Sequence, residues 1–121
     1  MVDESKKAGV SACFVDLTRK RWAQQLGEAF QLGDHAGAFE TSAMMALNLP
    51  LVREHERISI PPMDGLVASM KKGAKTFKEA GGDDAYFGDP GAATIEDGET
   101  ILEQLAEITS VSVMEHLASK S

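Results

Sequence analysis

With 121 residues, the chain is about the size of one small domain. Hydrophobic residues make up 43% of it and charged residues 26%, which is typical of globular proteins and excludes collagen-like and disordered classes. Its 19 acidic residues against 12 basic ones give a formal net charge of -7, which argues against a protein that binds the nucleic-acid backbone. We therefore expect residues 1–121 to form a single domain with no nucleic-acid partner.

The cysteine content and the amino-terminal segment indicate where in the cell the protein is found. Cys13 is the only cysteine, so no internal disulfide can form. Residues 1–7 lack the apolar run of a secretory signal, and no stretch approaches the roughly 18 apolar residues of a membrane span. These features predict a cytoplasmic protein with no membrane partner.

The first two predicted elements are a strand and a helix. Residues 10–15 form a short apolar run with a β-branched end, which predicts a buried strand. Residues 18–31 follow Asp16, a potential cap, and carry apolar side chains at helical spacing: Trp22, Leu26, Ala29 and Phe30. A strand followed by a helix is one unit of an α/β layer, so the predicted fold class is α/β.

A glycine-containing loop at residues 33–37 precedes a second predicted helix, 38–47, which ends before Pro50. Residues 51–69 mix short apolar pieces with charges. They are predicted to be irregular connections that hold at most one strand, at the alternating residues 58–60.

The last part of the chain is predicted to be turns followed by a long helix. Residues 81–84 and 88–91 are rich in Gly and Asp, which is typical of turns. A helix is then expected to begin at Thr94, because apolar residues recur at helical spacing along one stripe: Ile95, Ile101, Leu102, Leu105, Ile108, Val113 and Leu117.

Residues 33–42 hold the densest group of chemically active side chains. Glu40 is expected in the first turn of the helix, where the N-terminal dipole favours the carboxylate form. His35 lies five residues earlier and would have to reach back from the loop. A loop imidazole held by a fixed carboxylate is suited to proton transfer near neutral pH.

A purely structural interpretation of the same segment stays open. In it Asp34 or Thr41 caps the helix, His35 faces solvent and Glu40 only complements the dipole. A zinc site is disfavoured because the segment contains one histidine. A nucleophilic Ser42 is also disfavoured because no G-x-S-x-G turn surrounds it.

Two segments carry a resemblance to a known family. Residues 35–47 (HAGAFETSAMMAL), followed by Pro50 to Val52, resemble the H-[AG]-G-x-x-E-T-S-x-M-x-A-L segment of the creatininase family, the creatinine amidohydrolases. Residues 88–94, with Gly98 and Glu99, resemble the G-D-P-x-x-A-T-x-x-x-G-E segment near the end of the family's chains. The similarity runs from about residue 12 to the end.

The resemblance implies that residues 1–121 correspond to the C-terminal half of a three-layer α/β/α hydrolase that opens a C–N bond of a cyclic or linear amide. It implies that His35 is the catalytic proton shuttle and Glu40 its supporting carboxylate, with Asp34 and Gly37 supporting the site or binding substrate. It also implies a divalent metal centre, of zinc or manganese, whose bound water attacks the substrate carbon.

The family's metal-binding strings, E-x-H-G-x-H-L-P and N-G-H-G-G-N, do not occur in this sequence. His55, within the charged run 53–57, and His116, near the end of the last helix, are predicted to be solvated residues. The metal ligands are therefore expected in a complementary N-terminal half or subunit, and an oligomer is expected by analogy. The alternatives are a non-catalytic interaction subunit and a truncated small-molecule-binding domain.

Overall fold

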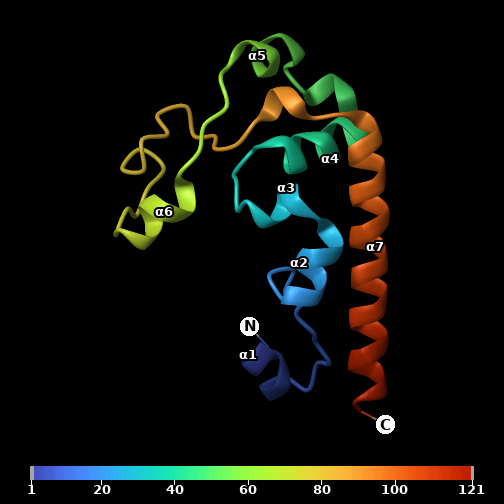
Figure 1. The fold of residues 1–121 in the computed structure, drawn as a ribbon. Coiled ribbons are helices and arrows are strands. Elements are labelled where there is room, and N and C mark those ends of the chain that lie inside the picture. Colours follow the sequence, from blue (N-terminus) through green and yellow to red (C-terminus); the bar gives the residue numbers. More distant parts are fainter. Residues whose placement is uncertain (1, 121) are drawn as a thin grey trace.

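The computed structural model describes residues 2–120, and within them the regular structure is helical. The long helix α7 runs along one side of the molecule, and α2, α3 and α4 are stacked beside it (Figure 1). The helices are α1 (Val2–Lys7), α2 (Lys20–Leu26), α3 (Glu28–Gln31), α4 (Ala38–Asn48), α5 (Glu54–Ser59), α6 (Leu66–Lys71) and α7 (Ile95–Ala118), with 3-10 turns η1 (Leu49–Leu51) and η2 (Pro90–Ala92).

The predicted α/β class and three-layer α/β/α fold are wrong for this chain. Residues 2–120 contain no sheet, and their only β pairing is two isolated antiparallel bridges, His35 with Phe87 and Met63 with Gly88. A strand becomes part of a sheet only if another strand lies beside it. The described residues supply no such partner.

The predicted buried strand at residues 10–15 is wrong, because this segment connects α1 to α2 without regular secondary structure or ladder pairing. No backbone hydrogen bond involves residues 11–15 within the described chain. Val10 and Phe14 are open to solvent, with 58% and 70% of each residue exposed, whereas Val15 is half-buried against the core. The apolar pattern therefore predicted a strand that the described chain does not form.

The helix predicted over residues 18–31 is divided at Gly27. The φ angle of Gly27 is 89°, in the region that favours glycine, and this residue ends α2 and precedes α3. Residues 51–69 were predicted to be irregular with at most one strand, but they contain helix α5, and the alternating residues Ile58 and Ser59 belong to it. Helix α6 is a further element that the sequence pattern missed.

The helices predicted at 38–47 and from Thr94 are confirmed as α4 and α7. The Thr94 hydroxyl caps α7 by accepting a hydrogen bond from the Asp97 N–H at 3.0 Å. None of the helices within residues 2–120 combines the length and the apolarity that a membrane crossing requires.

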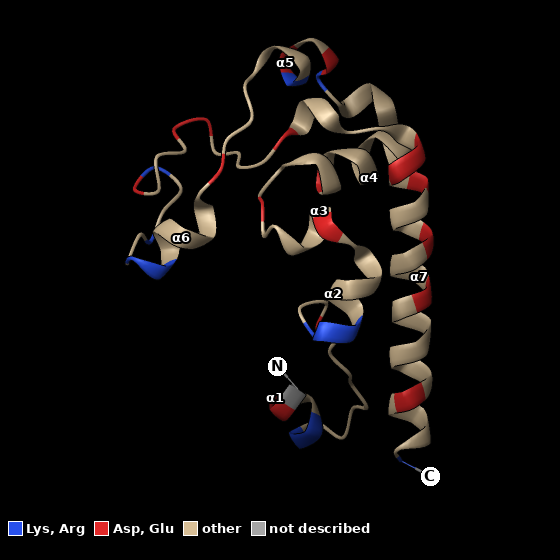
Figure 2. Ribbon diagram, in the orientation of Figure 1, with Lys and Arg blue, Asp and Glu red and all other residues tan. Residues whose placement is uncertain are grey.

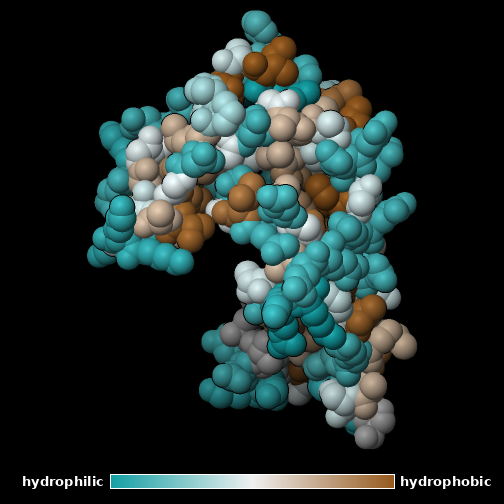
Figure 3. Space-filling model, viewed as in Figure 1, coloured by the Kyte–Doolittle hydropathy of each residue, from teal (hydrophilic) through white to brown (hydrophobic). Residues whose placement is uncertain are grey.

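The core lies where α4 and the shorter helices contact α7. Trp22 and Leu26 of α2 pack with Ile108 of α7, which is completely buried. Helices α4 and α7 share the most extensive interface between described helices. Other apolar side chains reach the surface, including those over α5 and α6 (Figure 3).

Candidate functional site

His35 and Glu40 line one open pocket of about 720 Å³. Its walls come from the loop before α4, the first turns of α4, helix α5 and the segment around Tyr86. The side chains that sequence reasoning placed together are therefore brought to the same cavity. Arg53, which the sequence did not single out, also lines the pocket.

The loop that carries His35 is fixed by backbone geometry. The His35 N–H donates to the Phe87 carbonyl at 3.0 Å, and the Phe87 N–H donates back at 2.7 Å. Ala36 has a φ angle of 53°, a conformation that non-glycine residues rarely adopt. These constraints hold His35 at the mouth of the pocket, just before α4 begins.

The imidazole of His35 packs against an aromatic ring. It is stacked on Phe77, with ring centroids 4.3 Å apart and an interplanar angle of 28°. His35 is half-buried, so it is not the fully solvent-facing loop residue of the structural interpretation. Stacking on Phe77 limits the orientations of the ring.

Glu40 was predicted to hold the imidazole of His35, but it bonds to the backbone of the loop instead. Its Oε2 accepts a hydrogen bond from the Ala36 N–H, and the Thr41 hydroxyl donates to the Ala36 carbonyl at 3.3 Å. The carboxylate thus holds the backbone next to His35 and makes no hydrogen bond to the imidazole. A capping-box glutamate reaches back past its helix N-terminus in a similar way.

Asp34 and Gly37 lie beside this loop, in a neighbouring cavity of about 520 Å³ that Glu40 also lines. A Cβ added at Gly37 would lie 3.0 Å from the Phe87 carbonyl oxygen, so glycine permits the close approach. Gly37 begins α4 without any side-chain cap, which argues against Asp34 or Thr41 as caps. Burial raises the pKa of the Asp34 carboxyl, and the negative charges of Asp64 and Glu40 raise it further.

The raised pKa predicts that Asp34→Asn stabilises the protein at pH 7. A carboxyl whose pKa is raised by folding costs stability once the pH exceeds its ordinary value of 3.8, and the cost grows up to the raised pKa. Thermal melts should show a Tm above that of wild type at pH 7 and no difference near pH 3. Asp83→Asn, at an exposed position, is the control for loss of one negative charge. An equal gain in that variant would contradict the assignment.

Arg57 supports the pocket wall. Its guanidinium forms an ion pair with Glu54 at 2.5 Å and donates to the carbonyls of Pro90 and Gly91 at 3.2 and 3.1 Å. These contacts tie α5 to η2. Arg53, in contrast, is exposed at the pocket and is the residue there that could meet an anionic group.

Residues 2–120 contain no group of three or more His, Cys, Asp or Glu side chains that could hold a metal ion. His55 is exposed, as predicted. His116 is half-buried, and its Nε2 lies 3.0 Å from the Ser11 hydroxyl in a hydrogen bond that is open to solvent.

The two sequence motifs contact each other in the structure. Ser42, 1% exposed, accepts a hydrogen bond from the Thr94 N–H at 3.1 Å, so its hydroxyl is structural. A Cβ at Gly98 would overlap the Ser42 carbonyl, and Gly88 lies directly against the Asp34 carboxyl. These contacts join α4 to the start of α7 and bring Gly88 against the loop that carries Asp34.

Comparison with known proteins gave one match. The model of a protein family described as Creatininase: Creatinine amidohydrolase matches residues 2–113. No curated protein and no solved structure matches the chain.

Proposed function

The chain belongs to the creatininase family, and on that premise we propose that it supplies the proton-transfer part of an amidohydrolase active site. Membership of this family suggests a metal-dependent amidohydrolase. Our proposal is finer: residues 1–121 act as one domain, equivalent to the C-terminal half of such an enzyme, on a cyclic or linear amide.

The observation that carries the proposal is the placement of His35 and Glu40 in one accessible pocket of about 720 Å³. A cavity of that size holds a small-molecule substrate. The imidazole enters it from a loop that Glu40 fixes through the Ala36 N–H. A catalytic proton donor needs a fixed position as well as suitable basicity.

The proposed role of His35 follows from the bond that breaks. Hydrolysis adds water across the C–N bond, so the carbon gains an oxygen and the departing nitrogen must gain a proton. Imidazole can take up and release a proton near neutral pH, so we assign to His35 the transfer to that nitrogen. Glu40 is a positioning residue in this scheme, and Asp34 and Gly37 shape the loop.

Residues 2–120 contain no group of three or more side chains that could hold a metal ion, and we propose that the ligands for zinc or manganese come from another polypeptide. We propose that a complementary N-terminal half or subunit provides them. Residues 11–15 make no backbone hydrogen bond within the described chain, and Val10 and Phe14 are exposed, so this segment is a suitable place for a strand of that polypeptide to pair. A larger oligomer could then form from the completed unit.

Complementation tests this function. The chain is to be co-expressed with the amino-terminal half of an active creatininase-family enzyme. Native mass spectrometry then reports the complex, and hydrolysis of creatinine and a panel of small lactams is assayed with Zn²⁺ or Mn²⁺. We expect a complex that hydrolyses an amide, and neither half active alone.

The outcomes separate the alternatives. A stable complex without hydrolysis under either metal would favour a non-catalytic interaction subunit. Binding of amides by the chain alone, without metal, would favour a small-molecule-binding domain. Full activity of residues 1–121 alone would overturn the division of roles.

A further inference from the structure

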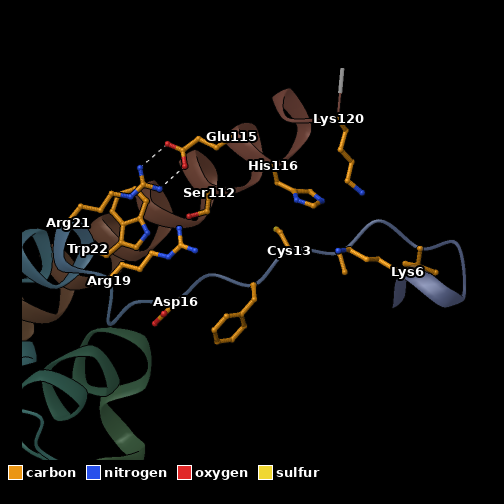
Figure 4. A pocket seen from close by; sticks show the side chains of 13 residues that line it. Lys6, Cys13, Asp16, Arg19, Arg21, Trp22, Ser112, Glu115, His116 and Lys120 are labelled. Carbon is orange, nitrogen blue, oxygen red and sulfur yellow. Dashed lines mark hydrogen bonds and ion pairs between the residues drawn. The ribbon is translucent and has the colours of Figure 1, made fainter. Parts of the chain in front are cut away.

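Three polar side chains meet at the end of the molecule opposite the candidate site, where the segment after α1 passes the last turns of α7 (Figure 4). The Ser11 hydroxyl oxygen lies 3.0 Å from the His116 Nε2 and 2.8 Å from the Lys120 ammonium. In Figure 4, the side chains of His116 and Lys120 point toward the segment that carries Cys13. A serine hydroxyl bonded to an imidazole is the pair that activates many serine nucleophiles.

The contact with Lys120 favours a Ser11 proton that is directed at the imidazole. An ammonium only donates hydrogen bonds, so the Ser11 oxygen accepts the one from Lys120. A neutral imidazole accepts at one nitrogen and donates at the other. The Ser11 hydroxyl is therefore free to donate to the His116 Nε2, which is the proton position that a general base needs.

The backbone fixes the positions of these side chains. The Val10 N–H donates to the Ser5 carbonyl at 2.9 Å, so the chain just before Ser11 is tied to α1. His116 belongs to α7, and Lys120 follows about one helical turn later, on the same side. The hydrogen bond from Ser11 to His116 joins parts of the chain that are 105 residues apart. The tertiary fold thus creates the pair.

The charges next to the hydroxyl favour a negative oxygen. The ammonium of Lys120 contacts it directly. Figure 2 shows the acidic residues along α7, and the last of them in the sequence is Glu115. Its carboxylate accepts two hydrogen bonds from Arg21, at 2.9 and 2.6 Å. A serine oxygen that attacks a carbon loses its proton, so a cation in contact with it stabilises the attack.

A pocket of about 530 Å³ adjoins the pair. His116 and Lys120 line it, together with the apolar side chains of Val10 and Phe14. Ser11 is exposed, so a reagent reaches its hydroxyl from solvent. A cavity of this size holds a small organic molecule, and its apolar wall suits a short acyl group.

We propose that Ser11 is a reactive serine that accepts an acyl group from an activated carboxylic ester, with His116 as the general base. The Ser11 oxygen bonds to the ester carbonyl carbon while its proton passes to the His116 Nε2. The bond between that carbon and the leaving oxygen then breaks, and His116 returns the proton to the departing alcohol. The products are acylated Ser11 and the free alcohol.

Acetylation by p-nitrophenyl acetate tests the proposal on the chain of residues 1–121. Absorbance follows the release of nitrophenolate, and peptide mass spectrometry locates the acetyl group. Cys13 lines the same pocket and a thiol also reacts with this ester, so every protein in the test carries Cys13→Ala. We expect acetylation of Ser11 and none of Ser110, an exposed serine of α7.

Variants identify the base. His116→Gln should slow the acetylation of Ser11 about 100-fold, because the proton acceptor is lost. His55→Gln removes an exposed imidazole elsewhere and should leave the rate unchanged. Far-UV circular dichroism verifies that both variants keep their helices. The proposal is overturned if Ser11 reacts no faster than Ser110, or if folded His116→Gln protein is acetylated at the rate of its parent.

Discussion

Replacement of His35 by alanine is expected to lower kcat of the complemented enzyme by about 10²–10⁴-fold, the usual contribution of a positioned proton donor. The imidazole is removed from the pocket, while the backbone bridge to Phe87 stays, since it uses only main-chain atoms. Binding of the complementary half should therefore be unchanged. Steady-state kinetics of amide hydrolysis and native mass spectrometry measure the two properties separately.

Two further variants make this test specific. His35→Gln keeps a polar side chain of similar size but cannot exchange a proton in the same way, so it should be as inactive as the alanine variant. His55→Ala removes an exposed histidine outside the pocket and should retain full kcat. An active His35→Gln enzyme would falsify the assignment of proton transfer to His35.

The second large effect is expected at Gly98, in the first turns of α7. A Cβ there would overlap the Ser42 backbone carbonyl and lie 2.9 Å from the Ala46 Cβ. Because backbone atoms of α4 cannot rotate aside, Gly98→Ala must push α4 and α7 apart. We expect a loss of about 2–4 kcal/mol in the free energy of unfolding, measured by denaturant titration.

The sign of this effect is diagnostic. Helix propensity alone predicts that glycine to alanine in a helix is stabilising by about 1 kcal/mol. Ser110→Ala, at an exposed position of α7, is the matched control and should change stability little. A Gly98→Ala protein more stable than wild type would show that the close contact between α4 and α7 is absent.

The helices could be predicted where local signals determine them. Thr94 followed by an apolar stripe defined α7, and the glycine loop before Ala38 defined the start of α4. The break at Gly27 depends on one backbone angle that the apolar spacing does not reveal. The strand at 10–15 was wrong because pairing requires a neighbour, and no local pattern reports whether a neighbour exists.

The candidate site could be predicted in its residues but not in its contacts. Motif resemblance identified His35 and Glu40, and the structure places both at one pocket. The bond from the Ala36 N–H to Glu40 and the stacking on Phe77 depend on three-dimensional folding. Arg53 was missed because a charged run usually faces solvent, and only the position of α5 brings it to the cavity.

The segment at residues 10–15 has a consequence for the solubility of the chain. Six residues without charge or proline, with open main-chain groups, have the composition that stacks into cross-β fibrils. Charged residues flank this segment on both sides, with Lys6 and Lys7 before it and Asp16 after it. Flanking charges slow self-association, because like charges repel one another when identical segments stack. Salt screens this repulsion, so high ionic strength should favour fibril growth by the isolated chain.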